Sequence, residues 1–269
     1  MCIQNHLCFD LGFPFDEPLT VYLESNRLGR TMAHVDRLPG CIVRARTADR
    51  AIGLVETAIA QHLEWLGHHA GVSRPAPATF TFHIAGQFSG SAASGSGSRV
   101  ALLPPDRWPL DRDELEQYLR RMAYSRQDLL KIITSLPGDV LAARDSSGRR
   151  SIREILQHLA AAEQWYLTRL WQVPRFPAQK TVLLRLHVVR EAAERLLAAS
   201  DLTLSDQVVD NGGEAWTLRK VLRRFLEHER EHMLEIVWRL HQTGLPAFPP
   251  WMSAQARSRE LLLAEEAQG

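Results

Sequence analysis

Two histidines four residues apart are the first residues of this sequence that could do chemistry. The stretch from His228 to His232 reads His-Glu-Arg-Glu-His. On a helix, residues four apart lie one turn apart on one face, so both imidazoles can reach a single metal ion. Apolar residues recur around the pair at helical spacing, and both histidines fall at the edge of that stripe, beside Phe225. The spacing therefore predicts two metal ligands that face a domain interior or a cleft.

A third ligand is needed, because two histidines do not complete a metal site. His158 flanks an earlier stripe of helical spacing, which is formed by Ile152, Ile155, Leu159, Ala162 and Tyr166. If the two helices are neighbours, His158, His228 and His232 can bind one divalent metal. Three histidines leave coordination positions open, as catalytic sites do and closed structural sites do not.

Glu229, between the paired histidines, has two interpretations. A helical wheel places it near the centre of the apolar stripe, while Glu231 points away. A carboxylate in that position is costly unless it is paired or orients a ligand. Glu229 is therefore either bonded to a basic side chain of a neighbouring helix, or a catalytic residue that supports a metal ligand or accepts a proton.

The same stretch also matches the HExxH pattern of zincin metalloproteases, in which the glutamate is the general base. The surrounding residues disfavour this alternative. Glu235 and Trp238 stand where a metzincin has its glycine and third histidine. A proline-rich segment, residues 247–250, follows where other zincins place a further helix with a glutamate ligand.

The elements that must position these histidines are four predicted helices in the second half of the chain. They span about residues 111–135, 151–171, 178–200 and 217–241. Asp111 with Glu114 and Ser151 with Glu154 form capping boxes at the first two starts, and Thr217 caps the last helix. No strand is predicted here, and the pattern favours an all-α four-helix bundle over residues 110–252. Residues 253–269 form a tail that is a short helix or frayed.

The first half of the chain has a different pattern. Residues 19–24, 31–35 and 41–46 read as strands, Thr47 can cap a helix with apolar residues at helical spacing, and residues 79–84 read as a closing strand. This βββαβ order predicts a small α+β domain over residues 1–85, with an antiparallel sheet and one helix on one face.

A linker separates the two predicted domains. Residues 86–98 read GQFSGSAASGSGS, and three prolines follow up to Pro109. A glycine- and serine-rich stretch has few side chains to pack and is typical of a flexible tether, which the prolines then stiffen. Residues 86–109 are therefore assigned to the linker.

Composition excludes several classes of partner. The 269 residues carry a formal net charge of +1, without the basic excess of a nucleic-acid-binding domain or a membrane-surface protein. Only three cysteines occur, with no CxxC pair, which fits a reducing compartment. No signal peptide or membrane span is expected, so the chain is expected to be cytoplasmic. A nearly neutral chain with three inward histidines fits a small-molecule site better than a nucleic-acid surface.

Residues around the histidines resemble the DinB/YfiT superfamily of metal-binding four-helix bundles. The resemblance covers about residues 110–251 and rests on His158 with Glu163 following, on the stretch from Trp216 through His232, and on the exit from Gly244 to Trp251. The resemblance implies a divalent metal, zinc, nickel or iron, held by His158, His228 and His232. It also implies a range of reaction types. Some members of the superfamily are thiol-dependent transferases or isomerases that use a low-molecular-weight thiol, and others are classed as hydrolases.

The first domain is similar to the HicB-like fold, whose members include toxin-neutralising antitoxins. The similarity, over about residues 19–85, rests on Leu38-Pro39-Gly40-Cys41 followed by the helix start at Thr47. It implies a protein partner for this domain. Because no DNA-binding element of the family's kind follows it in the sequence, an accessory role in oligomerisation or ligand sensing is the alternative. The overall expectation is a metal-dependent transferase, isomerase or hydrolase. The alternative is a regulatory binding protein whose bundle is a dimerisation scaffold with incidental metal.

Overall fold

The computed structural model describes residues 17–71, 80–90, 99–144, 149–173, 176, 179–199, 202 and 206–242. The predicted tail, residues 253–269, and the proline-rich segment 247–250 lie outside these residues. The chain divides into two compact units, residues 1–103 with 237–269, and residues 104–236. The first contains a small sheet and the second is helical, in agreement with two domains. No helix in the described ranges is long and apolar enough to cross a membrane.

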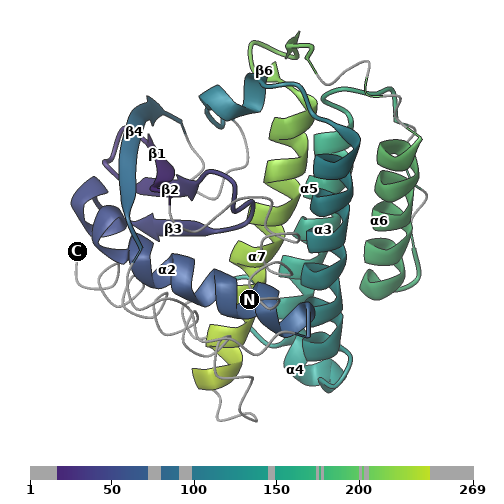
Figure 1. Ribbon diagram of the computed structural model, residues 1–269. Coiled ribbons are helices and arrows are strands. Elements are labelled where there is room, and N and C mark those ends of the chain that lie inside the picture. The colour runs from purple at the N-terminus through teal and green to yellow at the C-terminus, as the bar shows by residue number, and fades with distance from the viewer. Residues whose placement is uncertain are drawn as a thin grey trace. The chain divides into compact units, whose positions relative to one another are not determined.

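Four strands and a long helix build the described part of the sheet unit (Figure 1). In chain order they are β1 Leu19–Ser25, β2 Thr31–Val35, β3 Ile42–Ala45, α2 Ala48–His69 and β4 Phe82–Ser89. This is the predicted βββαβ order. The strands lie in the sheet in the order β3-β2-β1-β4.

The prediction of an antiparallel sheet is wrong for the last strand. β1 is antiparallel to β2, and β2 to β3, but β4 runs parallel to β1. β3 has the same direction as β1, and α2 then carries the chain back to the starting end of the sheet, as a crossover helix does. The residues of a single strand do not reveal this direction, because it depends on where the helix returns the chain.

Local polar contacts explain the hairpin and the start of α2. The Asn26 side chain accepts the backbone N–H groups of Leu28 and Arg30 at 2.9 and 3.1 Å. Gly29 has a φ of 79°, a conformation that glycine adopts without strain. Thr47 accepts the Arg50 N–H at 3.3 Å, so it caps α2 as predicted.

The predicted linker is largely ordered where the structure describes it. β4 continues to Ser89, four residues into the linker, and the Phe88 ring packs 6.1 Å from that of Tyr22. Val100 packs on Met32, and Leu103 belongs to the cluster of Tyr22. The linker was predicted from its glycine, serine and proline content, which did not reveal that Phe88, Val100 and Leu103 pack on side chains of the sheet. Residues 91–98, the centre of the predicted tether, lie outside the described residues.

In the described residues of the helical unit lie four long helices and two short ones. They are η2 Pro104–Arg107, α3 Arg112–Ile133, α4 Gly138–Ala142, α5 Ile152–Leu167, α6 Val182–Ala198 and α7 Leu218–Gln242. The last turns of α7, from Val237, belong to the first unit. Both predicted capping boxes are present, Asp111 with Glu114 and Ser151 with Glu154. α5 ends four residues earlier than predicted and α6 begins four residues later.

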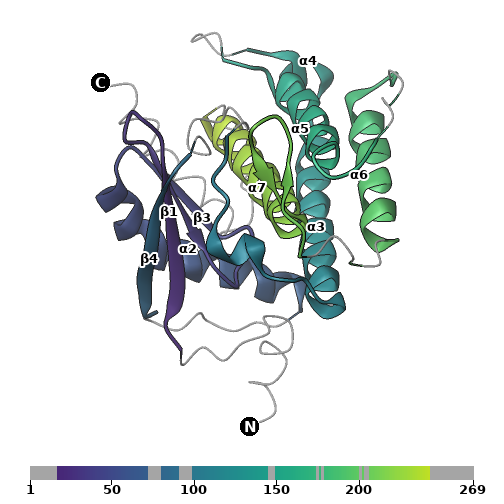
Figure 2. The ribbon, with the colours of Figure 1, turned by 90° about the horizontal axis from the view of Figure 1, so that it is seen from above.

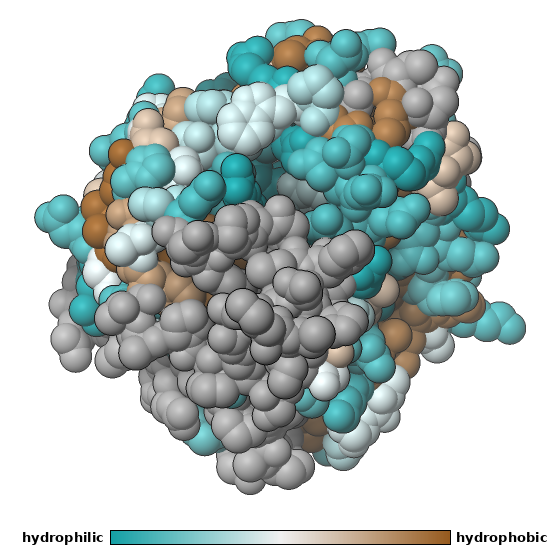
Figure 3. All heavy atoms as spheres, viewed as in Figure 1, coloured by the Kyte–Doolittle hydropathy of each residue, from teal (hydrophilic) through white to brown (hydrophobic). Residues whose placement is uncertain are grey.

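One hydrophobic core joins the four long helices, which run side by side (Figures 1 and 2). Each contributes fully buried side chains, for example Met122 from α3, Tyr166 from α5, Leu197 from α6 and Phe225 from α7. The outward faces of the helices are mainly hydrophilic in the view of Figure 3. This division is what amphipathic helices around a shared core produce.

The expectation that the second half holds no strand is wrong. β5 Val209–Asp210 and β6 Ala215–Trp216 form a short antiparallel hairpin. Its turn contains Gly212 and Gly213, with φ of 69° and 78°. Strands of two residues are too short to show an alternating pattern, so only the turn could have signalled them. Thr217 follows directly and accepts the Lys220 N–H at 3.1 Å, which confirms the predicted cap of α7.

Candidate metal centre

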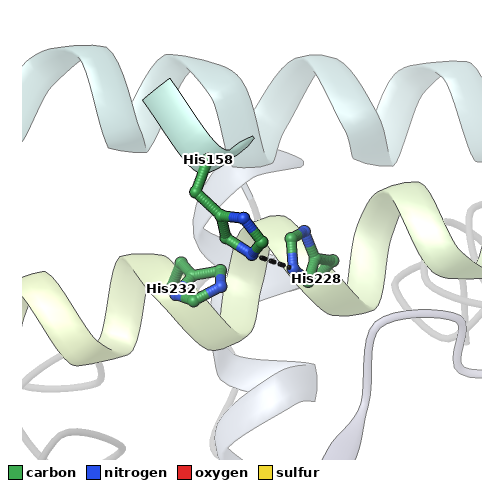
Figure 4. Close-up of side chains that lie close together, drawn as sticks. All are labelled: His158, His228 and His232. Carbon is green, nitrogen blue, oxygen red and sulfur yellow. Dashed lines mark hydrogen bonds between the residues drawn. The ribbon is translucent and has the colours of Figure 1, made fainter. Parts of the chain in front are cut away.

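The structure brings His158, His228 and His232 together within the helical unit (Figure 4). Their candidate ligand nitrogens all lie within 4.8 Å of one another. His158 comes from α5 and the other two from α7, and the three rings point toward one another. The ring centroids are 4.6 to 5.1 Å apart, and the rings stand nearly edge to face. His228 and His232 are buried, whereas His158 is only partly buried.

The spacing of these nitrogens suits a metal ion. Zinc binds imidazole nitrogen at about 2.0 to 2.1 Å, so two tetrahedral ligands have nitrogens about 3.3 Å apart. The Nε2 atoms of His158 and His228 are 3.2 Å apart. The buried Nε2 of His232 has no hydrogen-bond partner among the described residues. A divalent metal at this point would satisfy it, so the residues present fit a three-histidine site.

Glu235 orients one of the three histidines. Its Oε2 lies 2.9 Å from Nδ1 of His232, one turn along α7. A proton held on Nδ1 by this carboxylate leaves the lone pair of Nε2 free, which is the tautomer that a metal at this point would need. This role of Glu235 was not predicted from the sequence. The signal was its position three residues after His232, on the same side of the helix.

The surroundings keep two of the imidazoles neutral. Burial lowers the pKa of His158 to about 4, with further lowering by His232 and Arg150. Burial also lowers the pKa of His228 well below its usual value, again with contributions from His232 and from Arg224. Because a metal binds the neutral imidazole, these ligands need not release a proton to bind a metal at neutral pH.

Tyr166 forms part of the wall beside the cluster. Its ring centroid lies 5.9 Å from that of His228, and it also packs on Phe225. Its hydroxyl receives a hydrogen bond from Arg224 at 3.3 Å. Burial raises the pKa of Tyr166, so it stays a neutral phenol at ordinary pH. The side of His228 toward the core is therefore closed by an aromatic ring.

Glu229 does not face the three histidines as a free carboxylate. Its Oε2 accepts hydrogen bonds from Nε of Arg126 at 2.7 Å and from Arg190 at 3.0 Å. Burial alone would raise the pKa of Glu229, but the two guanidinium groups outweigh burial and lower it. These are the contacts of the first interpretation of Glu229, a carboxylate paired with basic side chains of neighbouring helices.

Residues 121–236, which include all three histidines, match the family model of the DinB superfamily. The helical unit is thus similar to that superfamily, and its histidine cluster fits a metal-binding protein of this kind. No curated protein and no solved structure matches the chain. The matched residues do not include the sheet unit, whose resemblance to the HicB-like fold stays a prediction.

Proposed function

We propose that the helical unit is a DinB-like four-helix bundle that binds one divalent metal ion, zinc, nickel or iron, and acts with it on a small molecule. His158, His228 and His232 would hold the ion. The observation that carries the proposal is the convergence of the three imidazoles, with a buried Nε2 on His232 that lacks a partner among the described residues.

A metal held by three neutral imidazoles supplies a Lewis acid with open positions for water or a substrate thiolate. The chain's own residues prepare this site. Glu235 fixes the tautomer of His232, Tyr166 closes the core side of His228, and burial keeps His158 and His228 unprotonated. His158 is the least buried ligand, so substrate would approach from its side.

Among the reaction types that the resemblance implies, these residues favour transfer to a low-molecular-weight thiol. Hydrolysis commonly uses a separate general base to activate water. Glu229 is engaged by two arginines and Glu235 by His232, so neither carboxylate is free for that role. A thiol would have less need of such a base, because its pKa is already far below that of water before a divalent metal held by the three histidines lowers it further. The same contacts disfavour the zincin alternative, because its glutamate must act as the base.

Metal analysis of the freshly purified full chain tests the proposal. We expect roughly one divalent metal per chain, lost in both His158→Ala and His228→Ala, because two imidazoles seldom complete such a site. His187→Ala is the matched control, because His187 is an exposed histidine of α6. Wild-type protein that binds no metal would refute the site. Metal that persists in both ligand variants would favour the competing hypothesis, a regulatory protein with incidental metal.

A partner of the sheet unit is a separate question. The HicB-like resemblance implies either a small protein partner or homodimerisation through this unit. Co-purification with the tagged full chain would reveal the first, and the oligomeric state in solution would reveal the second. Neither result bears on the metal site, because all three ligands lie in the helical unit.

A further inference from the structure

Four buried charged side chains, one from each long helix, meet inside the helical unit. They are Arg126 of α3, Glu163 of α5, Arg190 of α6 and Glu229 of α7, here called the ion quartet. All four are at most 8% exposed. Two positive and two negative charges balance within the quartet, so it adds no net charge to the core.

The quartet is extensively cross-bonded. Arg126 Nη2 donates to Glu163 at 2.6 Å, and its Nε donates to Glu229 at 2.7 Å. Arg190 also contacts both carboxylates, pairing closely with Glu163 and donating to Glu229 at 3.0 Å. Each carboxylate is therefore held by two guanidinium groups, and each guanidinium group bridges α5 and α7.

The two arginines also bind reciprocally across α3 and α6. Arg126 donates to the carbonyl oxygen of Leu186, four residues before Arg190 on α6, at 3.0 Å. Arg190 donates to the carbonyl oxygen of Met122, four residues before Arg126 on α3, also at 3.0 Å. The arginine forks are thus themselves anchored to the backbone, and they present fixed donors to the two glutamates.

Such a network is a poor device for stability alone. Removing charges from water costs several kcal/mol per ion, and well-packed apolar residues of similar volume often stabilise as much or more. Arg190, in contrast, binds both oxygens of Glu163 through its Nε and Nη2, and such a bidentate pair requires one relative position of the two groups. The network therefore sets the geometry of the helices more strictly than apolar contacts do.

That geometry is the one the metal ligands need. Glu229 follows His228 directly on α7, and Glu163 lies five residues after His158 on α5. Five residues correspond to about 7.5 Å along a helix, and a slip by one residue shifts a side chain by about 1.5 Å. Metal–ligand distances tolerate only about 0.2 Å. The axial position of α5 against α7 must therefore be fixed far more closely than one residue.

We infer that the ion quartet sets the register of α5 against α7 and so places His158 over His228 and His232. Arg126, Glu163, Arg190 and Glu229 are positioning residues of the metal site. The inference rests on the proposed function, because it concerns the same site. In this inference Glu229 helps to fix the relative position of the two helices that carry the histidines, and it does not act as a proton acceptor.

The test replaces the whole quartet, because a single substitution would leave a buried charge unpaired and would be strongly destabilising by itself. In the variant with Arg126→Met, Arg190→Met, Glu163→Leu and Glu229→Leu, we expect a cooperative thermal transition and a helical circular dichroism spectrum like those of the wild type. Zinc affinity, measured by competition with a chromophoric chelator, should fall about 10- to 100-fold, as it does when residues behind metal ligands are removed. The visible absorption spectrum of bound cobalt(II) should change, because it reports ligand geometry.

A matched control removes another ion pair between α7 and α3 that does not involve α5. Arg219 donates to Glu114 at 2.8 Å, and Arg219→Met with Glu114→Gln should leave zinc affinity and the cobalt spectrum unchanged. If the quadruple variant does not fold, the double variant Arg126→Lys with Arg190→Lys is measured in its place. It keeps all four charges but loses both planar guanidinium groups, so the inference predicts a lower zinc affinity than in the wild type.

The outcomes separate this inference from the proposed function. Wild-type zinc affinity and an unchanged cobalt spectrum in the folded quartet variant would overturn the positioning role and leave the metal site intact. A wild-type chain that binds neither zinc nor cobalt would overturn both. An equal loss of affinity in the Arg219 control would also refute the inference, because the loss would then follow from removing any ion pair between the helices and not from removing the quartet.

Discussion

The three histidines share one cluster but have different surroundings. His228 is buried beside Tyr166, His232 is hydrogen-bonded to Glu235, and His158 is partly open to solvent. A metal site built from such ligands depends on the groups behind them as well as on the nitrogens. The side chain of Glu235 is the most direct of these groups.

Replacing Glu235 tests this dependence. Glu235→Gln keeps the shape but weakens the hold on Nδ1 of His232, so zinc affinity should fall about 10-fold. Chelator competition measures the change. Glu191→Gln is the control, because Glu191 is an exposed glutamate of α6 that pairs with Arg195 at 3.3 Å. An affinity equal to that of the wild type in Glu235→Gln would remove Glu235 from the site.

The stability of the metal-free protein should depend on pH through His158. Burial holds the pKa of His158 at about 4 in the folded chain, whereas the ordinary pKa of a histidine, as in the unfolded chain, is about 6.5. Between these values the unfolded chain binds more protons than the folded chain, so the free energy of unfolding rises with pH and falls as the solution is acidified. Urea denaturation at several pH values from 7 to 4.5 measures the slope.

In His158→Ala this slope should become smaller, because one of the groups that titrate only in the unfolded chain is gone. The exposed His187→Ala should keep the wild-type slope. Identical slopes in the wild type and His158→Ala would show that the burial of His158 does not keep it neutral.

At the scale of elements, the site depends on where α5 begins and how it meets α7. The Ser151 side chain accepts a hydrogen bond from the Glu154 backbone N–H, and the Glu154 carboxylate accepts one from the Ser151 backbone N–H at 2.8 Å. This capping box starts the helix seven residues before His158. Arg126 and Arg190 then hold α5 and α7 together through their carboxylates. The cap sets where the helix begins, and the ion quartet sets its register.

Removing the cap should therefore affect stability more than metal binding. Ser151→Ala should cost about 1 kcal/mol of unfolding free energy, a typical value for a lost N-cap. Ser151→Asp, which retains a capping oxygen, should restore most of it. Zinc affinity should stay within about 3-fold in both, because the first turn frays without moving the quartet. A large loss of zinc affinity in Ser151→Ala but not in Ser151→Asp would show that the cap, and not the quartet, fixes the position of α5 against α7.

At the scale of the molecule, the metal should couple to stability. A ligand that binds only the folded state stabilises it by about 2.7 kcal/mol at 100 times its dissociation constant. Adding zinc to the metal-free chain should raise the unfolding temperature, and chelation should reverse the rise. His228→Ala should show neither effect. An equal response to zinc in this variant would place the ion elsewhere on the chain.

Much of the helical unit could be predicted from the sequence. The apolar stripes, both capping boxes, the cap at Thr217 and the inward face of His158, His228 and His232 are local features with a period of 3.6 residues. Short β-prone runs, turns and one helical stripe likewise predicted the order of strands and helix in the sheet unit. They failed where a pattern was too short, as in β5 and β6, or masked by glycine and serine, as in β4.

Local sequence thus determined which residues are helical, which face each helix buries and which side chains are candidate ligands. Only the tertiary structure decided the parallel direction of β4, the pairing of His232 with Glu235, and the meeting of Arg126, Glu163, Arg190 and Glu229. The reason is physical. Periodicity and caps act within one element, whereas strand direction and the partner of a buried charge depend on elements that are distant in the chain and adjacent only after packing.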